Sequence, residues 1–267
     1  MPPEFKTEAD LVKCFIEALQ RDRLLDSWTP YHESCGFDLM LVHKVEGTQI
    51  GIEAKLRMNA KVISQALPRY EYNDDGPDFR AVLVPFKGVS DDWSAICQAL
   101  GLSMIASGRV ERGLRNGIIA EFTGELPNPT KENWWADRRW TFWNPIRRCK
   151  LPEYVPDVTG GKPSPLTLTP WKIKAIKLLI VLDRRGFVTR RDMRGLKISP
   201  SYWCDHWAGH LAKAGGGKWI RTDRTPDFKA QHPENWQQIE ADIDEWAKPL
   251  DPLDRDLDPG GQEKLIV

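Results

Sequence analysis

The chain has 267 residues, of which 41% are hydrophobic and 28% charged, and its 38 basic side chains balance its 38 acidic ones. This length suffices for two domains, or one large one, with a packed core. The N-terminal residues lack the apolar stretch of a secretory signal, and no segment approaches the run of about 18 apolar residues that spans a membrane. The five cysteines are scattered without a CxxC pair. We therefore expect a soluble cytoplasmic protein with reduced thiols and without a membrane partner, a disulfide framework or a zinc site.

Charge is unevenly distributed along the chain. Residues 161–229 contain fifteen Lys and Arg against five Asp and no Glu, a formal charge of +10. Residues 230–267 carry a charge of −7, which leaves −3 for residues 1–160. The neutral total therefore conceals a basic segment suited to a nucleic acid.

The first predicted element is a helix that begins after Thr7, because Leu11 and Phe15 start an apolar pattern with four-residue spacing. Glu8 falls in the first turn of this helix, where the helix dipole favours an anion. Two roles stay open for Glu8, that of a capping acid and that of a metal ligand. Glu17 projects from a later turn and ranks below it.

Residues 28–34 are interpreted as a connection to two apolar runs, residues 35–43 and 49–56, which have the composition of strands. Both runs carry charged side chains where a buried strand normally carries none. Gly47 can supply the positive φ of a tight turn, so the runs are predicted to form a hairpin with Glu46 and Gly47 at its tip.

This register would place Asp38 opposite Lys55 and Met40 opposite Glu53. Side chains alternate along a strand, so Asp38, Glu53 and Lys55 are expected on one face, with the two carboxylates about 7–8 Å apart. Such a pair can share a divalent cation while the lysine orients a water molecule. The alternative is a solvated edge hairpin with a weak surface ion pair, but the Leu and Ile residues around the charges favour a central hairpin.

A helix over residues 60–67 follows and is predicted to end at Pro68. It carries Gln65, which is either an ordinary helix residue or one that lies near the proposed site. Positive charge suited to phosphate contacts is supplied nearby by Arg57, Lys61 and Arg69.

The remaining elements of the first domain are shorter. We predict a strand at residues 78–85, a helix at 92–100 and short strands at 102–108 and 118–122. Together these elements predict an α/β domain over residues 1–123, in which helices cover a mixed sheet.

The next segment, residues 124–166, is a Pro/Trp/Arg-rich connector whose prolines exclude long regular structure. Its aromatic and basic side chains, among them Trp140 and Trp143, can stack bases and bind phosphates, or they can anchor the segment to the core. We favour anchoring, because a structureless connection of this length needs contacts with the rest of the protein.

Residues 167–228 are predicted to form a small, mainly α domain. One helix begins at Pro170 and ends at Gly186, a second follows Thr189, and a third runs from Pro200 to about residue 213. A glycine-rich turn then leads into a basic hairpin. Three helices and such a hairpin describe a winged helix-turn-helix, which places its third helix in the major groove of double-stranded DNA and its wing on the backbone.

The charge of +10 favours DNA over the alternative of a protein partner for this domain. His206 and His210 are four residues apart, but no third metal ligand at a recognisable spacing accompanies them. The residues predicted to contact DNA are Arg190, Arg191, Arg194, Tyr202, His206, Lys213, Lys218 and Arg221. The last segment, residues 229–267, is predicted to contain an amphipathic helix over 233–247 and then an acidic tail. We expect the tail to be solvated, with competition against DNA as the second option.

The charged residues of the first domain occur in a recognisable order. Glu8 lies on a helix, Asp38 on a strand, the sequence Glu53-Ala54-Lys55 on the next strand and Gln65 on the following helix. In this order they resemble the core of the PD-(D/E)xK nuclease superfamily. Phe37 stands where the superfamily name has proline, a departure that the superfamily often shows.

The resemblance covers residues 5–85 and implies a restriction-endonuclease-like mixed-sheet sandwich. It implies that Asp38 and Glu53, with the Ala54 carbonyl, hold Mg²⁺ or Mn²⁺, and that Glu8 contributes to the same or a second ion. The resemblance further implies that Lys55 orients the attacking water and that Gln65 lies near the metal or the phosphate backbone.

The sequence as a whole thus predicts a metal-dependent DNA nuclease, an endonuclease rather than an exonuclease, directed to DNA by a basic winged-helix domain. Its setting would be phage or mobile-element DNA processing, restriction-like defence or repair. The alternative is a DNA-binding regulator or accessory protein whose nuclease-like domain is inactive. Action on RNA is disfavoured, because no RNA-recognition signature is present. Winged helices and nuclease domains both dimerise often, so a homodimer is left open.

Overall fold

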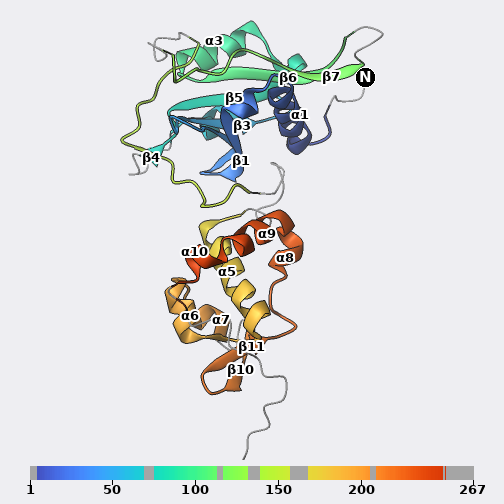
Figure 1. Ribbon diagram of the computed structural model, residues 1–267. Helices are drawn as coiled ribbons and strands as arrows, with labels where there is room; N and C mark the ends of the chain where they lie inside the picture. Colours follow the sequence, from blue (N-terminus) through green and yellow to red (C-terminus); the bar gives the residue numbers. More distant parts are fainter. Residues whose placement is uncertain are drawn as a thin grey trace, which may run out of the picture. The chain divides into compact units, whose positions relative to one another are not determined.

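The structure is a computed structural model that describes residues 5–68, 75–112, 117–131, 139–156, 168–204, 209–248 and 250. The chain divides into two compact units between residues 167 and 168. Figure 1 shows helices around a sheet in the N-terminal unit and a mainly helical C-terminal unit. Among the described helices, none has the length and apolar character needed to cross a membrane.

The N-terminal unit is built on a six-stranded mixed sheet. Its strands are β1 (Trp28–Ser34), β2 (Phe37–His43), β3 (Gln49–Ala54), β5 (Phe79–Pro85), β6 (Ser103–Glu111) and β7 (Ile118–Thr123). They lie side by side in the order β1-β2-β3-β5-β6-β7. The three central strands β3, β5 and β6 are parallel, whereas the outer pairings are antiparallel.

Helices cover both faces of this sheet. They are α1 (Glu8–Arg21), α2 (Ala60–Ala66) and α3 (Asp91–Ala99). Along β5, Ala81 and Leu83 pack in the core that includes α1, whereas Val82 between them packs in the core that includes α2 and α3. Neighbouring residues of a strand point to opposite faces, so α1 lies on one face and α2 with α3 on the other. The prediction of an α/β unit with a mixed sheet is confirmed.

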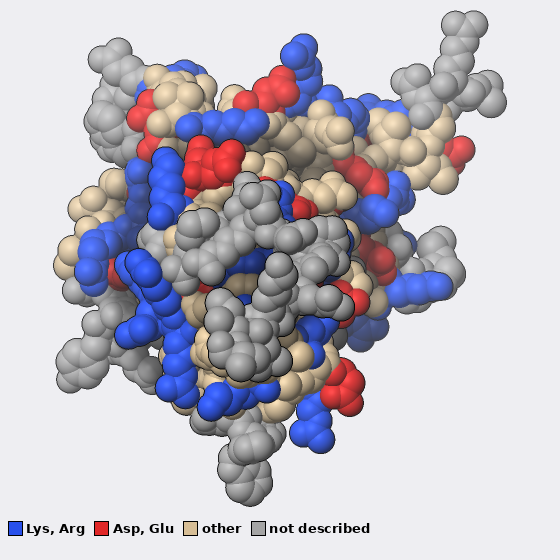
Figure 2. Space-filling model, turned by 60° about the horizontal axis from the view of Figure 1, so that its bottom comes forward, with Lys and Arg blue, Asp and Glu red and all other residues tan. Residues whose placement is uncertain are grey.

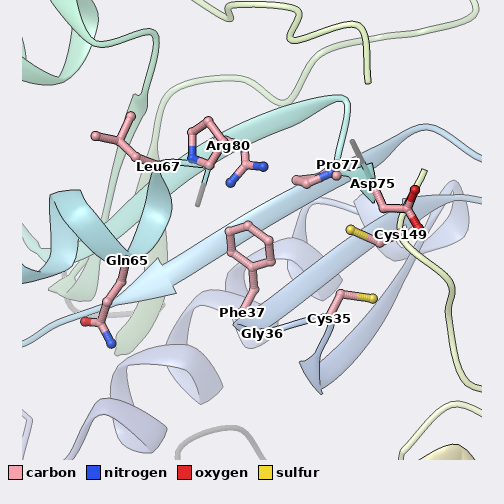
Figure 3. Close-up of a pocket in the computed structure, with 11 residues that line it drawn as sticks. Cys35, Gly36, Phe37, Gln65, Leu67, Asp75, Pro77, Arg80 and Cys149 are labelled. Atoms are coloured by element: carbon pink, nitrogen blue, oxygen red, sulfur yellow. The ribbon is translucent and has the colours of Figure 1, made fainter. Parts of the chain in front are cut away.

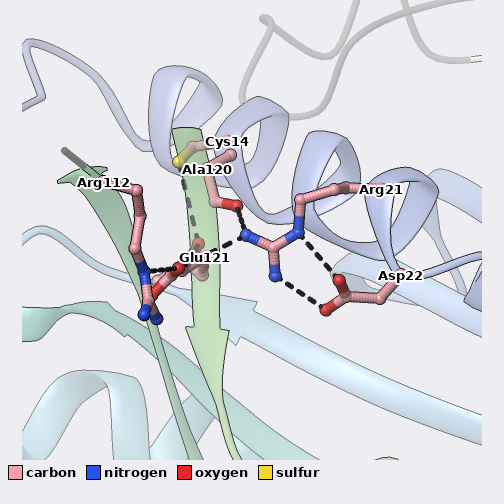
Figure 4. A network of polar contacts seen from close by, with 7 residues as sticks. Cys14, Arg21, Asp22, Arg112, Ala120 and Glu121 are labelled. Atoms are coloured by element: carbon pink, nitrogen blue, oxygen red, sulfur yellow. Dashed lines mark hydrogen bonds and ion pairs between the residues drawn. The ribbon is translucent and has the colours of Figure 1, made fainter. Parts of the chain in front are cut away.

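Both ends of α1 are held by polar contacts. At its start, Thr7 and Asp10 form a capping box, so the predicted N-terminus of this helix is confirmed. At its end, the guanidinium of Arg21 donates to the Ala120 carbonyl of β7 at 2.6 Å and pairs with Asp22 (Figure 4). These contacts fix the helix along the sheet and thereby fix the position of Glu8 in its first turn.

Strand β1 corrects one prediction. Residues 28–34, interpreted from the sequence as a connection, pair with β2 along their length, from Trp28 opposite His43 to Ser34 opposite Phe37. The segment lies at the edge of the sheet, where Pro30 is tolerated because one side of an edge strand needs no ladder hydrogen bonds. Its polar side chains lack the alternating apolar pattern that predicts a strand. The segment forms a strand because it pairs with β2.

The register of the β2–β3 hairpin also differs from the prediction. Met40 stands opposite Gly51, not Glu53, and Leu39 stands opposite Ile52. The loop contains four residues, 44–47, because the amide of His43 donates to the Thr48 carbonyl at 2.8 Å. The difference in register is two residues, an even number, so every side chain stays on its predicted face.

The connector belongs to the N-terminal unit. Trp140 is buried, donates to the Glu125 carbonyl at 2.8 Å and packs edge to face against Phe79. Trp143 donates to the Gly101 carbonyl at 3.1 Å. The short strand β8 (Arg147–Arg148) pairs with β4 (Asp75–Gly76). The anchoring interpretation is therefore confirmed for the described tryptophans, while residues 132–138 and 157–167 lie outside the described part.

The C-terminal unit contains a three-stranded antiparallel sheet with the order β10-β11-β9 and six helices in its described part. Its elements are α5 (Pro170–Arg185), β9 (Val188–Thr189), α6 (Arg190–Gly195), α7 (Pro200–Cys204), β10 (Leu211–Gly215), β11 (Lys218–Arg221), α8 (Phe228–Gln231), α9 (Pro233–Ala241) and α10 (Ile243–Trp246). The predicted start of α5 at Pro170, its end at Gly186 with φ of +77° and the cap of α6 at Thr189 are confirmed.

Two predictions for this unit are wrong. The helix from Pro200 does not run to residue 213, because Gly209 has a positive φ of +61° and Lys213 lies in β10, paired with Trp219. The helix expected over residues 233–247 is divided into α9 and α10. Helix α9 packs on α5, so these residues belong to the same compact unit as residues 168–228 and not to a separate segment.

A buried ion pair joins α5 to α6. Arg185 and Asp192 are 4% and 0% exposed, and the guanidinium contacts the carboxylate. Asp192 also accepts hydrogen bonds from the backbone amide of Thr189 at 2.7 Å and from its hydroxyl at 2.8 Å. A buried charge is tolerated when it is paired and hydrogen-bonded, so each partner depends on the other.

We expect Asp192→Ala to lower the free energy of unfolding by about 3–5 kcal/mol, because it leaves the Arg185 cation buried without its partner. Equilibrium urea unfolding measures this loss. The matched control is Asp183→Ala, which removes an exposed ion pair with Arg221 and should cost no more than about 1 kcal/mol. Equal losses in the two variants would contradict the assigned role of the buried pair.

Candidate functional site

The candidate site lies where β2 begins and β3 ends. Leu39 pairs with Ile52, which brings their neighbours Asp38 and Glu53 together. The Ala54 amide donates to Asp38 Oδ2 at 2.7 Å, and the carboxyl group of Glu53 donates a hydrogen bond to the carboxylate of Asp38. Glu53 is only 4% exposed, whereas Asp38 is half-buried. Two acids therefore share one proton at this position.

Burial and mutual repulsion determine the protonation of this pair. Burial, followed by the charge of Asp38, raises the pKa of Glu53 to about 8. Burial also raises the pKa of Asp38, although the hydrogen bond from the Ala54 amide and the charge of Lys55 oppose the increase. Two such carboxyl groups titrate as a coupled pair, in which Glu53 keeps its proton to the higher pH.

Lys55 joins this pair to α1. Its ammonium group donates to Glu8 Oε2 at 2.7 Å, and both side chains are partly exposed. Burial would lower the pKa of Lys55, but the hydrogen bond and charge of Glu8 and the charges of Asp38 and Glu53 raise it. The predicted convergence of Glu8, the acid pair and the lysine is therefore present in the structure.

Fewer acidic side chains come together at this site than the sequence predicted for a metal site. In the described ranges, no three or more His, Cys, Asp or Glu side chains form a group that could hold a metal ion. Glu8 contacts Lys55 instead of joining the carboxyl pair. Asp38 and Glu53 are thus the two carboxylates available to a cation here, and Glu8 and Lys55 form the adjacent ion pair.

Gln65 occupies a different place. It lines a cavity of about 350 Å³ together with Phe37, Arg80, Cys35 and Cys149 (Figure 3). Its Oε1 atom is buried without a hydrogen-bond partner. The described contacts do not join it to Asp38 or Glu53, so Gln65 is a residue of the cavity wall in this structure. Phe37, which lines the cavity, precedes Asp38 in the chain.

The basic residues predicted to bind phosphates are mostly exposed. Arg57 is exposed before α2, Lys61 is exposed within α2, and Arg69 lies outside the described residues. In the C-terminal unit, Lys218 stacks on the Phe187 ring at 4.6 Å and Arg221 pairs with Asp183. The exposed residues of the predicted set are Arg190, Arg191, Arg194, Tyr202, Lys213, Lys218 and Arg221, and His206 lies outside the described residues. Figure 2 shows Lys and Arg side chains prominent on the face turned forward there, with Asp and Glu side chains among them.

One contributor to the site was missed by sequence reasoning. The charge of Glu33 on β1 adds to the increase in the pKa of Glu53. Glu33 has a positive φ of +48°, a backbone conformation that few residues other than glycine adopt. It was missed because residues 28–34 were interpreted as a connection; recognition of the edge strand would have placed it beside β2.

Comparison of the chain with models of protein families, with curated proteins and with solved structures found no match. A function is therefore inferred from the arrangement of these side chains.

The protonated state of Glu53 predicts how stability depends on pH. The folded protein holds this proton up to about pH 8, whereas a glutamate in an unfolded chain loses it near pH 4.3. Between these values the folded state binds more protons, so the free energy of unfolding should fall as pH rises. We expect Glu53→Gln to flatten this decline and to be the more stable protein at pH 8, as measured by urea unfolding from pH 5 to pH 8.5.

Asp38→Asn provides the matched control. It keeps an acceptor for the Ala54 amide but removes the charge that repels the Glu53 carboxylate, so the decline should shift to lower pH. Parallel pH profiles for wild type and both variants would show that the acid pair does not titrate as described.

Proposed function

We propose that the protein is a divalent-metal-dependent nuclease that hydrolyses phosphodiester bonds in DNA. The observation that carries this proposal is the hydrogen-bonded pair Asp38 and Glu53 beside the Lys55–Glu8 ion pair. Two acids forced together while largely removed from water are unusual in a purely structural role, because their repulsion opposes folding. Such a cluster is a candidate for chemistry.

The chemistry of the donor set fits Mg²⁺ or Mn²⁺. Both ions prefer carboxylate oxygens, and Asp38 and Glu53 present carboxyl groups that repel each other without a cation between them. Glu53 would give up its proton when a cation is held, so binding should strengthen as pH approaches about 8. When bound, the ion would supply a more acidic water and a polarised phosphate.

The lysine and the helix glutamate have separate roles in this proposal. Lys55, which lies next to the acid pair, orients the attacking water and stabilises negative charge on the phosphate. Glu8 holds the ammonium group at 2.7 Å and so acts as a positioning residue. The capping box of Thr7 and Asp10 positions Glu8 in turn, because it defines the first turn of α1.

The C-terminal unit supports DNA as the substrate. Its element order α5-β9-α6-α7-β10-β11, with β9 paired to β11, resembles the order expected of a winged helix-turn-helix. The β10–β11 turn contains Gly216 and Gly217, both with positive φ, and presents Lys218 at its end. A basic unit of this architecture would bring duplex DNA to the nuclease-like unit, and cutting within a duplex corresponds to an endonuclease.

One observation favours the second candidate, a DNA-binding regulator with an inactive nuclease-like unit. The ammonium group of Lys55 is engaged by the carboxylate of Glu8 at 2.7 Å, which would hold it away from a reacting water. A fixed Lys55–Glu8 pair would serve only to join α1 to β3. The two candidates differ in one measurable respect, which is metal-dependent cleavage.

The cleavage experiment uses the full-length protein with plasmid and linear DNA in Mg²⁺, Mn²⁺ or EDTA. We expect cleavage with either metal, an increase as pH rises towards 8, and none in EDTA. Asp38→Asn, Glu53→Gln and Lys55→Ala should each reduce the rate at least about 100-fold, because each removes a ligand or the charge beside the reacting water.

The control for this series is Glu17→Gln on α1, the helix that carries Glu8, because the Glu17 carboxylate pairs with Arg109 and not with the acid pair or Lys55. It should leave the rate unchanged. DNA binding that persists in all variants, together with no cleavage by the wild type under any condition, would favour the regulator.

DNA binding is tested separately. We expect the double variant Arg190→Ala/Arg194→Ala and the single variant Lys218→Ala to weaken binding to a DNA duplex. Each phosphate that a variant can no longer bind should also lower the slope of log K against log[salt] by about one. The control for Lys218→Ala, which also removes one positive charge, is Lys13→Ala at an exposed position of α1 outside the predicted set. If Lys13→Ala lost as much affinity as the variants of Arg190, Arg194 and Lys218, the predicted DNA-binding surface would be wrong.

A further inference from the structure

Two of the five cysteines, far apart in the sequence, meet in the N-terminal unit. Cys35 lies in the turn between β1 and β2, and Cys149 follows β8. The Cys149 thiol donates a hydrogen bond to the Cys35 sulfur, and Figure 3 shows the two side chains at the same end of the cavity. Both are free thiols in this structure. The scattered spacing, which predicted reduced thiols, gave no indication that two of them meet in the fold.

Both thiols are held on well-defined backbone. The Cys149 amide donates to Gln49 Oε1 at 2.9 Å, and Gln49 Nε2 donates to the Cys149 carbonyl at 2.9 Å. Gln49 is 3% exposed and belongs to β3, so Cys149 is fixed to the centre of the sheet. Cys35 lies in a tight turn with Gly36, and its thiol also contacts the Lys150 carbonyl at 3.5 Å.

The two sulfur atoms have different environments. Cys35 is exposed, and the hydrogen bond from Cys149 lowers the pKa of its thiol. Cys149 is half-buried, and its hydrogen bond to Cys35, followed by burial, raises the pKa of its thiol, whereas the nearby guanidinium of Arg80 opposes this increase. An accessible thiol of lowered pKa next to a second thiol is the arrangement of an attacking and a resolving cysteine.

The other cysteines lack this arrangement. Cys14 and Cys97 are buried, and the thiol of Cys204 contacts the sulfur of Met193 in the C-terminal unit. Burial of a thiol in apolar surroundings suppresses its reactivity, because the thiolate is the reactive form. Selective chemistry at Cys35 is therefore expected.

We propose that Cys35 and Cys149 form a reversible disulfide by exchange with a low-molecular-weight disulfide. The Cys35 thiolate attacks one sulfur of the small disulfide, which breaks the S–S bond and releases one small thiolate. The Cys149 thiolate then attacks the Cys35 sulfur of this mixed disulfide and releases the second small thiolate. The two protons lost by the cysteines pass to the two released thiolates, and the protein is oxidised by two electrons while the small disulfide is reduced.

The new bond would join the β1–β2 turn to the segment after β8. Both segments line the cavity next to Phe37, and Phe37 precedes Asp38 of the candidate site. Oxidation would therefore fix one wall of this cavity. The proposal does not rest on nuclease activity, because its readout is the state of the two sulfur atoms.

The test uses the folded full-length protein, first reduced, then freed of reductant and incubated with oxidised glutathione. Free thiols are counted by maleimide labelling after denaturation, and crosslinked peptides are identified by mass spectrometry. We expect a fall from five thiols to three, a single Cys35–Cys149 crosslink, and full recovery of five thiols with dithiothreitol.

Variants separate the two steps. Cys149→Ser should accumulate a mixed disulfide at Cys35 that carries one glutathione, whereas Cys35→Ser should form neither the crosslink nor a rapid adduct. The control Cys204→Ser should form the crosslink like the wild type. Three results would overturn the proposal: the wild type retains all five thiols, it forms a stable glutathione adduct in place of the crosslink, or the crosslinks involve the other cysteines. The wild-type measurement stands even if a variant fails to fold.

Discussion

The pairing of β2 with β3 is the constraint on which the candidate site depends. It brings Asp38 and Glu53 into hydrogen-bonding contact and places Lys55 at the end of β3, within reach of Glu8 on α1. Apolar residues alternate with these charges and pack in the core beneath α1, so a shift of one residue would turn the charged side chains into that apolar core. Hydrophobic packing thus determines which face of the hairpin carries the acids.

The acid pair opposes the stability of the fold that holds it. Glu53 is 4% exposed and stays protonated because burial and the Asp38 charge disfavour its carboxylate. The opposite condition holds in the C-terminal unit, where Asp192 is also buried but its Oδ2 atom contacts the cation of Arg185 and the backbone amide of Thr189. The two buried acids therefore differ in their effect on folding: Asp192 stabilises a junction between helices through its ion pair, whereas the repulsion between Glu53 and Asp38 opposes folding.

Local patterns in the sequence were sufficient to predict where most helices begin and which face of the sheet carries the charged strand residues. The caps at Thr7, Thr169 and Thr189 depend on side chains within three residues, so their prediction needed no tertiary information. The predicted register of the β2–β3 hairpin was wrong by two residues. The alternation of side chains predicts which face each residue occupies, but it does not determine the length of the loop. Strand β1 and the end of α7 were missed because pairing with the next strand, of β1 with β2 and of β10 with β11, overrides weak local preference. The Cys35–Cys149 contact is longer in range still and had no sequence signal.

The position of Lys55 connects the charge state of the site to its proposed activity. At neutral pH the ammonium group faces Glu8 and the Asp38 carboxylate, while Glu53 is protonated. Loss of the Glu53 proton would add negative charge beside the ammonium group and strengthen its attraction to the acid pair relative to Glu8. Lys55 is therefore a side chain shared between two anionic partners, and the balance between them changes with the state of Glu53. This balance is the physical difference between a lysine that joins α1 to β3 and one that is available to a reacting water.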